Sequence, residues 1–182
     1  SKSILMTVNG FIHAYARNGD VQRANVWFNK LTENLHVEPD AYTISGMINA
    51  YTRQMKQMGF STSRDVKRDS ADAERWFAIA SDKYNITPDS VLCLTMLKAY
   101  ATAGQGDTAL KFLEKMKLDG IPPTIRHFNI ALSAYMNSNT YAYTNQKSRD
   151  STQTQREMGF RKAVKLFDSI PEHNLKPNKV TF

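Results

Sequence analysis

Cysteine is almost absent from this chain. Cys93 is the only one among 182 residues, so no disulfide can form within the chain. It lies in the apolar run 91–94, where a buried and unreactive thiol is expected rather than a nucleophile. Zinc sites built from paired cysteines are therefore excluded within these residues.

Other signatures of catalysis and of membrane insertion are missing too. No apolar run approaches the roughly 20 residues that span a bilayer. There is no glycine-rich phosphate loop and no nucleophile with a suitable base beside it. The histidines are scattered without the spacing that metal ligands need. We therefore expect a non-catalytic protein with no metal, other cofactor, small-molecule substrate or membrane partner. These histidines are His13, His36, His127 and His173.

Acidic residues are fewer than basic ones. Lysine and arginine number 24 against 17 for aspartate and glutamate, which gives a net charge of +7 and a pI near 9.5. Such an excess favours a polyanionic partner, although many basic proteins bind no nucleic acid. The chain starts at Ser1 and stops at Phe182 inside a pattern, so we expect it to be part of a longer protein.

The pattern begins with four similar segments, each ending in Ala-Tyr after an apolar pair and one polar residue. Apolar positions three and four apart place a stripe on one face of a helix. Each segment therefore predicts the first helix of a repeated unit. The four segments are 9–15, 45–51, 94–100 and 129–135.

A second helix repeats as well. Its mark is an alanine followed by large apolar residues three, four and seven positions later, which lets two helices approach closely. Each unit then closes on a proline turn, because proline cannot continue a helix and the polar residue after it can cap the next one. The alanines are Ala24, Ala73, Ala109 and Ala163, and the turns are 37–40, 86–89, 121–124 and 175–178.

These marks divide the chain into four units of 36, 49, 35 and 54 residues and the start of a fifth. The extra residues of the two long units fall between their helices, at about 55–68 and 137–155. The second stretch is polar and nearly free of aliphatic residues, and we expect flexible loops at both places. The units are 5–40, 41–89, 90–124 and 125–178, followed by 179–182.

Helical pairs with a period near 35 predict an all-α fold, an α-solenoid of helix-turn-helix repeats. The early tryptophan and Leu-Gly pair of tetratricopeptide repeats are missing, since Trp27 and Trp76 lie in second helices. Instead the units resemble the pentatricopeptide repeat family from Leu5 to Phe182. The resemblance rests on Gly-Asp before the second helix at 19–20 and 106–107, on Leu-Glu-Lys-Met-Lys-Leu-Asp-Gly-Ile at 113–121, and on the closing Pro-Asp.

That resemblance implies a right-handed superhelix whose first helices line a basic groove for single-stranded RNA, one base to each repeat. Two side chains of a repeat then read the base, one early in the first helix and one at the end of the unit. The implied sequence is U-G-N-C/U, because leucine can form no hydrogen bond in the third repeat. The reading pairs are Asn9 with Asp40 (uracil), Ser45 with Asp89 (guanine), Leu94 with Thr124 (no match) and Asn129 with Asn178 (cytosine, then uracil).

The resemblance also implies a wedge against each base and a phosphate contact near the end of the first helix. Met6, Tyr42, Val91 and Arg126 hold the wedge positions, of which Tyr42 and Arg126 either stack on a base or serve packing and surface. Arg17 and Arg53 hold the phosphate positions. The reading residues also have a purely structural alternative, since asparagine and aspartate often satisfy backbone amides at helix ends.

Two functions remain in view. The first is sequence-selective binding of single-stranded RNA in organellar RNA processing, stability or translation. The alternative is a structural subunit of a mitochondrial ribosome or another ribonucleoprotein assembly, whose partners would include ribosomal proteins. A pure protein scaffold fits the charge less well. The resemblance alone implies a mitochondrial or plastid location.

Overall fold

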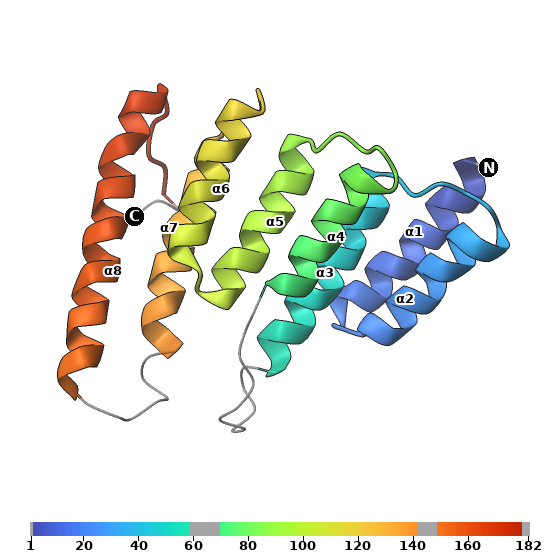
Figure 1. The fold of residues 1–182 in the computed structure, drawn as a ribbon, viewed down its shortest axis with the longest axis horizontal. Coiled ribbons are helices and arrows are strands. Elements are labelled where there is room, and N and C mark those ends of the chain that lie inside the picture. Colours follow the sequence, from blue (N-terminus) through green and yellow to red (C-terminus); the bar gives the residue numbers. More distant parts are fainter. Residues whose placement is uncertain (1, 59–69, 142–148, 180–182) are drawn as a thin grey trace. The chain divides into compact units, whose positions relative to one another are not determined.

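The computed structural model describes residues 2–58, 70–141 and 149–179, and the described residues contain α-helices and no β-strand (Figure 1). The all-α prediction is confirmed. Short π and 3-10 turns, Lys30–Asn34 and Ile170–His173, extend two of the second helices. The helices are α1 (Lys2–Arg17), α2 (Val21–Asn29), α3 (Ala41–Met58), α4 (Ala71–Asp82), α5 (Ser90–Ala103), α6 (Gly106–Leu118), α7 (Ile125–Tyr141) and α8 (Arg149–Ser169).

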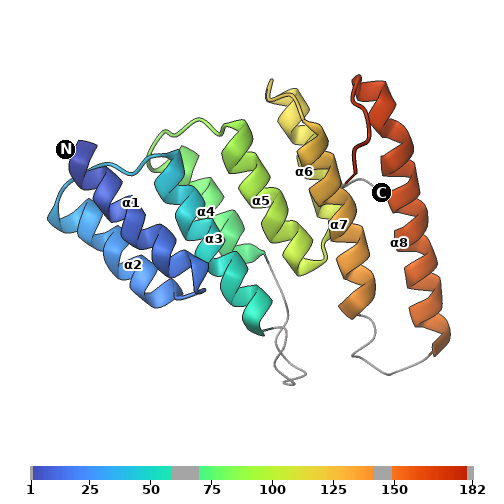
Figure 2. The same cartoon turned by 180° about the vertical axis from the view of Figure 1, so that it is seen from behind.

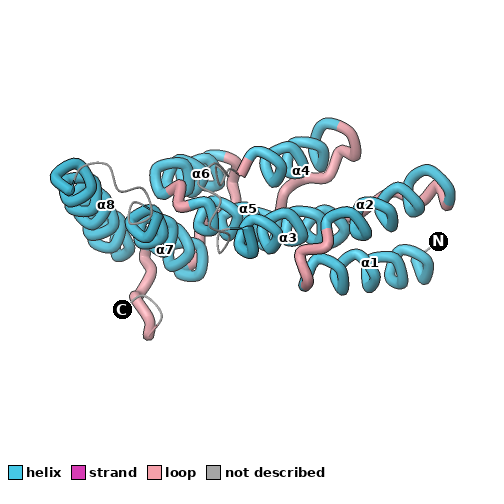
Figure 3. The backbone as a smooth tube through the Cα atoms, turned by 90° about the horizontal axis from the view of Figure 1, so that it is seen from below, coloured by secondary structure: helices cyan, strands magenta, loops and turns pink. Residues whose placement is uncertain are grey.

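The chain forms two compact units, Ser1–Ala99 and Tyr100–Phe182, whose boundary lies within α5. In the first unit α1 packs on both α2 and α3, and α3 packs on α4 (Figure 2). Figure 3 shows that α2 lies over α1 and α4 over α3, as expected of stacked hairpins. In the second unit α7 packs on α6 and on α8.

The core follows the predicted stripes. The alanine of each second helix is buried, and so is the residue two turns later. One turn after the alanine, Phe28, Leu166 and both Phe112 and Leu113 are buried, whereas the two tryptophans are half-buried. Burying a Leu, Ile or Phe side chain contributes about 1.5–3 kcal/mol, so these stripes supply most of the driving force for stacking. Phe28 also packs against Trp76 of the next second helix with ring centroids 4.6 Å apart.

Every repeat ends its second helix in the same way. A residue with left-handed backbone stands three positions before the closing proline, where it terminates the helix and turns the chain. In the first two repeats, the residue after the left-handed one donates its backbone N–H to a carbonyl oxygen of the second helix. Val37 donates to Leu31 at 3.0 Å, and Ile86 donates to Ala80 at 2.8 Å. The left-handed residues are His36, Asn85, Gly120 and Asn174, with φ of 49°, 52°, 75° and 56°.

The helices extend into both inserted segments beyond the limits predicted from the sequence. Helix α3 continues through Met58, because Met55 extends its apolar stripe and is buried. Helix α7 runs to Tyr141 and α8 starts at Arg149, so the loop predicted for 137–155 is wrong at both ends. A helix anchored by packing further along can propagate through polar residues. Residues 59–69 and 142–148 lie outside the described part.

One motif behind the family resemblance was matched to the wrong residues. The glycines at the turn between the two helices are Gly19 and Gly104, with φ of 66° and 71°. Each is four residues after the Ala-Tyr tyrosine, and the following residue occupies the N-cap position of the second helix, where Asp20 but not Gln105 accepts a backbone N–H through its side chain. Gly106 is therefore not the counterpart of Gly19. The Gly-Asp at 106–107 instead begins α6.

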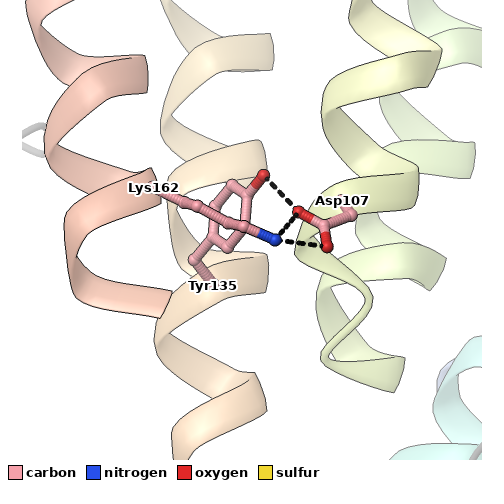
Figure 4. Close-up of polar contacts among 3 residues, drawn as sticks. All are labelled: Asp107, Tyr135 and Lys162. Carbon is pink, nitrogen blue, oxygen red and sulfur yellow. Dashed lines mark hydrogen bonds and ion pairs between the residues drawn. The ribbon is translucent and has the colours of Figure 1, made fainter. Parts of the chain in front are cut away.

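Asp107 joins three helices of the second unit (Figure 4). The Tyr135 hydroxyl on α7 donates to its Oδ1 at 3.0 Å, and Lys162 Nζ on α8 donates to both oxygens at 2.8 and 2.7 Å. The Lys162 hydrogen bond lowers the pKa of Asp107 below its usual 3.8. Burial, followed by the bond to Asp107, raises the pKa of Tyr135.

Replacing Asp107 by asparagine is expected to destabilise the fold at neutral pH and to have no effect in strong acid. A depressed pKa means that the carboxylate contributes stability above its unfolded-state pKa and that this is lost as pH falls through the folded-state pKa. The Asp107 and Lys162 side chains are 61% and 43% exposed, so screening limits the effect to below about 1 kcal/mol. Thermal unfolding followed by circular dichroism at both pH values measures this.

Asp72→Asn is the control, because the Asp72–Arg75 pair lies within one helix. An Asp107→Asn loss that is the same at both pH values would contradict the electrostatic explanation.

Candidate nucleic-acid interface

The reading pair of the first repeat is in direct contact. Asn9 lies in the middle of α1 and is buried, whereas Asp40 precedes α3 and is exposed. The Asn9 amide donates from Nδ2 to Asp40 Oδ1 at 3.2 Å. Because Asn9 is far from the helix start, its amide does not cap α1, and the end-capping alternative is wrong for this residue.

Both aspartates of the predicted pairs do cap helices. Oδ1 of Asp40 accepts the Thr43 N–H at 2.8 Å, and Oδ1 of Asp89 accepts the Leu92 N–H at 2.7 Å. Within the described residues no hydrogen bond engages Oδ2 of either side chain. Capping and base reading are therefore compatible, since one oxygen serves the helix and the other can accept from a ligand.

The remaining pairs differ from one another. In the fourth repeat Asn129 Nδ2 donates to Asn178 Oδ1 at 3.1 Å, so this pair also meets. In the second, Ser45 is buried and makes no hydrogen bond to Asp89, both of which the structure describes. In the third, Leu94 is buried, and the Thr124 hydroxyl lies 2.8 Å from Nδ1 of His127.

The four wedge residues are all exposed, with Met6, Tyr42 and Val91 at 67%, 57% and 62%. Tyr42, Val91 and Arg126 are each the second residue of their helix. Such a position lifts the side chain clear of the packed stripe, as a contact with a base would need.

Sequence reasoning missed His13, which supports one wedge. Its ring stacks on Tyr42 with centroids 3.9 Å apart and planes at 20°. Its Nε2 lies 3.0 Å from the Tyr42 carbonyl oxygen, which can only accept, so Nε2 carries the proton. A Cβ on Gly46 would come within 3.0 Å of this nitrogen, so the glycine makes room for the ring. In the other three repeats the position equivalent to His13 is occupied by three different polar residues, so the repeat pattern does not mark it.

The predicted phosphate contacts are free to bind an anion. Arg17 is the last residue of α1, and Arg53 lies in the second half of α3; both are exposed. The three ion pairs among the described residues use other cations, namely Arg23, Arg75 and Lys162. An unpaired guanidinium can bind a phosphate through two parallel hydrogen bonds.

Other kinds of site are not apparent in the described ranges. Among those residues no three histidine, cysteine, aspartate or glutamate side chains are grouped to hold a metal ion. None of the helices searched is long and apolar enough to cross a bilayer. Cys93 is buried, as predicted.

Comparison with known proteins gives consistent results. The sequence model of the pentatricopeptide repeat domain matches residues 81–138, and that of the PPR repeat matches residues 6–34. A mitochondrial pentatricopeptide repeat-containing protein of Arabidopsis thaliana is 28% identical over 119 residues, which are 65% of this chain and 18% of that protein. The chain thus spans about a fifth of the length of this relative.

A solved structure has a similar fold. The crystal structure of the maize pentatricopeptide repeat protein PPR10 matches 97% of this chain and 20% of that one, with a TM-score of 0.69 and 19% identity. At that identity the likeness concerns the fold, an α-solenoid. The chain thus matches models of the pentatricopeptide repeat family at two separate places, and its second helices end in a common closing turn, so in sequence and in fold it is similar to proteins of that family.

Proposed function

We propose that this chain binds single-stranded RNA, with one repeat facing one base, as part of organellar RNA metabolism. The observation that carries the proposal is the first-repeat pair, in which the Asn9 amide is bonded to an exposed carboxylate. An amide offers a donor and an acceptor, which is what the exposed edge of an unpaired base requires. Arg17 supplies a cation on the same helix.

For these pairs the family resemblance implies the base order U-G-N-C/U from the 5′ end. The third repeat contributes no preference, because Leu94 can form no hydrogen bond. The mitochondrial name of the Arabidopsis relative supports an organellar location. In the proposed role the repeats bind RNA through groups on their surface and catalyse no reaction.

An RNA containing U-G-N-C is expected to bind at least tenfold more tightly (about 1.4 kcal/mol) than its scrambled counterpart. Fluorescence anisotropy at moderate salt measures both affinities. A sharper test is Asn178→Asp, which changes one exposed amide into a carboxylate. Repeat four then has the asparagine–aspartate pair that repeat one has. We expect the preference at the fourth base to move from cytosine to uracil.

Asn174→Asp is the matched control, since it introduces the same charge four residues earlier at an exposed helix end. It should weaken binding slightly and leave the preference unchanged. Equal affinity for both RNAs would instead support the second function, in which the solenoid contacts folded RNA and proteins of a ribonucleoprotein assembly. The buried Leu94 in a reading position is the observation that favours this alternative.

A further inference from the structure

We infer that Thr43, which lies outside the two reading positions, sets how strictly the first repeat discriminates between pyrimidines. Thr43 acts as a positioning residue: its hydroxyl holds the Asn9 amide and the Asp40 carboxylate in one arrangement. The inference rests on the proposed function and adds to it a third residue that decides base selectivity.

Thr43 is the centre of a closed hydrogen-bond network. Its side chain is fully buried, with the hydroxyl 2.7 Å from Asn9 Oδ1 and 2.8 Å from Asp40 Oδ1. The hydroxyl also accepts the backbone N–H of Asp40 at 3.2 Å. One hydroxyl proton is thus held between two acceptors, and the backbone N–H groups of Asp40 and Thr43 are both bonded to side chains. Buried networks of this kind are rigid when every member is satisfied.

The network permits only one orientation of the Asn9 amide. A carboxylate can only accept hydrogen bonds, so Nδ2 must face Asp40. Oδ1 then faces the Thr43 hydroxyl, which donates to it. A flipped amide would place Oδ1 against the carboxylate, with two acceptors in contact. The fixed amide keeps one N–H and one oxygen lone pair for a ligand.

A fixed amide distinguishes the two pyrimidines, whereas a free one does not. Uracil presents a carbonyl acceptor beside an N–H donor on its pairing edge, and cytosine presents an amino donor beside a nitrogen acceptor. The order of donor and acceptor is reversed, so an amide that could flip would accept both bases. An amide held in one orientation therefore binds uracil in preference to cytosine.

The corresponding residue differs in the next two repeats. It stands three positions after the closing residue of the unit, at Leu92 and His127. Leu92 is buried and has no side-chain donor, so Asp89 is held only by a backbone N–H. His127 is buried and accepts the Thr124 N–H through Nδ1 at 3.0 Å. The first of these three repeats is thus the one in which a side-chain donor fixes both members of the reading pair.

Thr43→Val tests the inference, because valine keeps the shape and removes the hydroxyl. We would measure anisotropy with two RNAs that differ only in uracil or cytosine at the base facing repeat one. The parent should prefer uracil by about tenfold, and Thr43→Val should bring that ratio to within about threefold of parity. The guanine preference at the second base should not change. Thr43→Ser retains the hydroxyl and should retain the uracil preference.

Leu92→Val is the matched control, since it alters the same place in the next repeat without removing a hydrogen bond. Circular dichroism confirms folding; if Thr43→Val does not fold, Thr43→Ala, which avoids placing a branched apolar group against Asn9, takes its place. A folded variant without the hydroxyl that keeps the full uracil preference would overturn the inference. A Thr43→Ser variant as unselective as valine would also overturn it, because packing and not the hydroxyl would then be responsible. A parent with no pyrimidine preference would overturn the proposed function itself.

Discussion

Gly106→Ala is expected to destabilise the second unit by about 1–3 kcal/mol, the usual cost of forcing an extra methyl into a packed site. Gly106 is the first residue of α6 and is buried against the ring of Tyr135 on α7. A Cβ at this position would overlap Cδ1 and lie 2.6 Å from Cε1 of that ring. Contacts this short cannot be relieved without moving the ring or the helix.

The ring has little freedom to move. Tyr135 is buried, and its hydroxyl donates to Asp107, the residue next to Gly106 in α6. Turning the side chain away would break this bond and leave a cavity between α6 and α7. The cost is therefore steric in origin, and removing the ring should remove it. In the background of Tyr135→Ala, the same alanine at 106 should cost little, which a double-mutant cycle measures.

Gly10→Ala provides the comparison. Gly10 lies within α1 with no atom within 4 Å of where a Cβ would be. Alanine is the better helix former by up to about 1 kcal/mol, so this change should be neutral or stabilising. Urea unfolding followed by circular dichroism reports both variants, while fluorescence of Trp27 and Trp76 reports only the first unit. An unchanged circular-dichroism midpoint in Gly106→Ala would mean that the α6–α7 contact is looser than described.

The sequence was sufficient for the repeats because the repeating features are local. Ala-Tyr, the alanine of the second helix and the closing proline each act within one or two turns of chain, so their spacing predicts hairpins directly. The equivalence of Gly19 with Gly104 was also available, since each follows the Ala-Tyr tyrosine by four residues. It was missed because Gly106-Asp107 copies the residue types of 19–20 at a different place.

The candidate site was less accessible to sequence reasoning. Thr43 and Asn9 are 34 residues apart, and their hydrogen bond depends on how α3 packs on α1. His13 and Tyr42 meet only because Gly46 leaves space, which a glycine in the sequence does not indicate by itself. Residues that face a base in the proposed complex can be placed by repeat register. Residues that hold them in position cannot be placed in this way, because their partners come from the neighbouring repeat and the repeat pattern does not specify them.

Tyr42→Ala is expected to lower affinity for the U-G-N-C RNA by about 5- to 150-fold. The Tyr42 side chain is 57% exposed, so one face of the ring is open to a base while His13 covers the other. Stacking of a base on an aromatic side chain contributes about 1–3 kcal/mol, which corresponds to this range. A ring already stacked on the protein loses little rotamer freedom when the base arrives, which favours the upper part of the range.

The neighbouring variants separate stacking from other roles. Tyr42→Phe removes the hydroxyl and keeps the ring, so it should bind RNA like the parent. His13→Ala leaves the tyrosine unsupported and should lose part of the affinity, while His13→Phe should restore it. Phe160→Ala removes an aromatic of similar exposure from α8, outside the predicted wedge positions, and should have no effect.

A direct measurement of stacking uses 2-aminopurine, whose fluorescence is quenched when it stacks. Placed at the first or second base of the RNA, on either side of the position that register assigns to Tyr42, it should be quenched by the parent and by Tyr42→Phe. Tyr42→Ala should leave it bright even at saturating protein. If all three proteins quench it equally, or if alanine and phenylalanine variants bind alike, then Tyr42 packs on His13 for the stability of the α1–α3 contact and does not touch the base. The exposed ring and the stacked imidazole would then form a structural pair between α1 and α3, and the reading pair of the first repeat would act without a contribution from Tyr42.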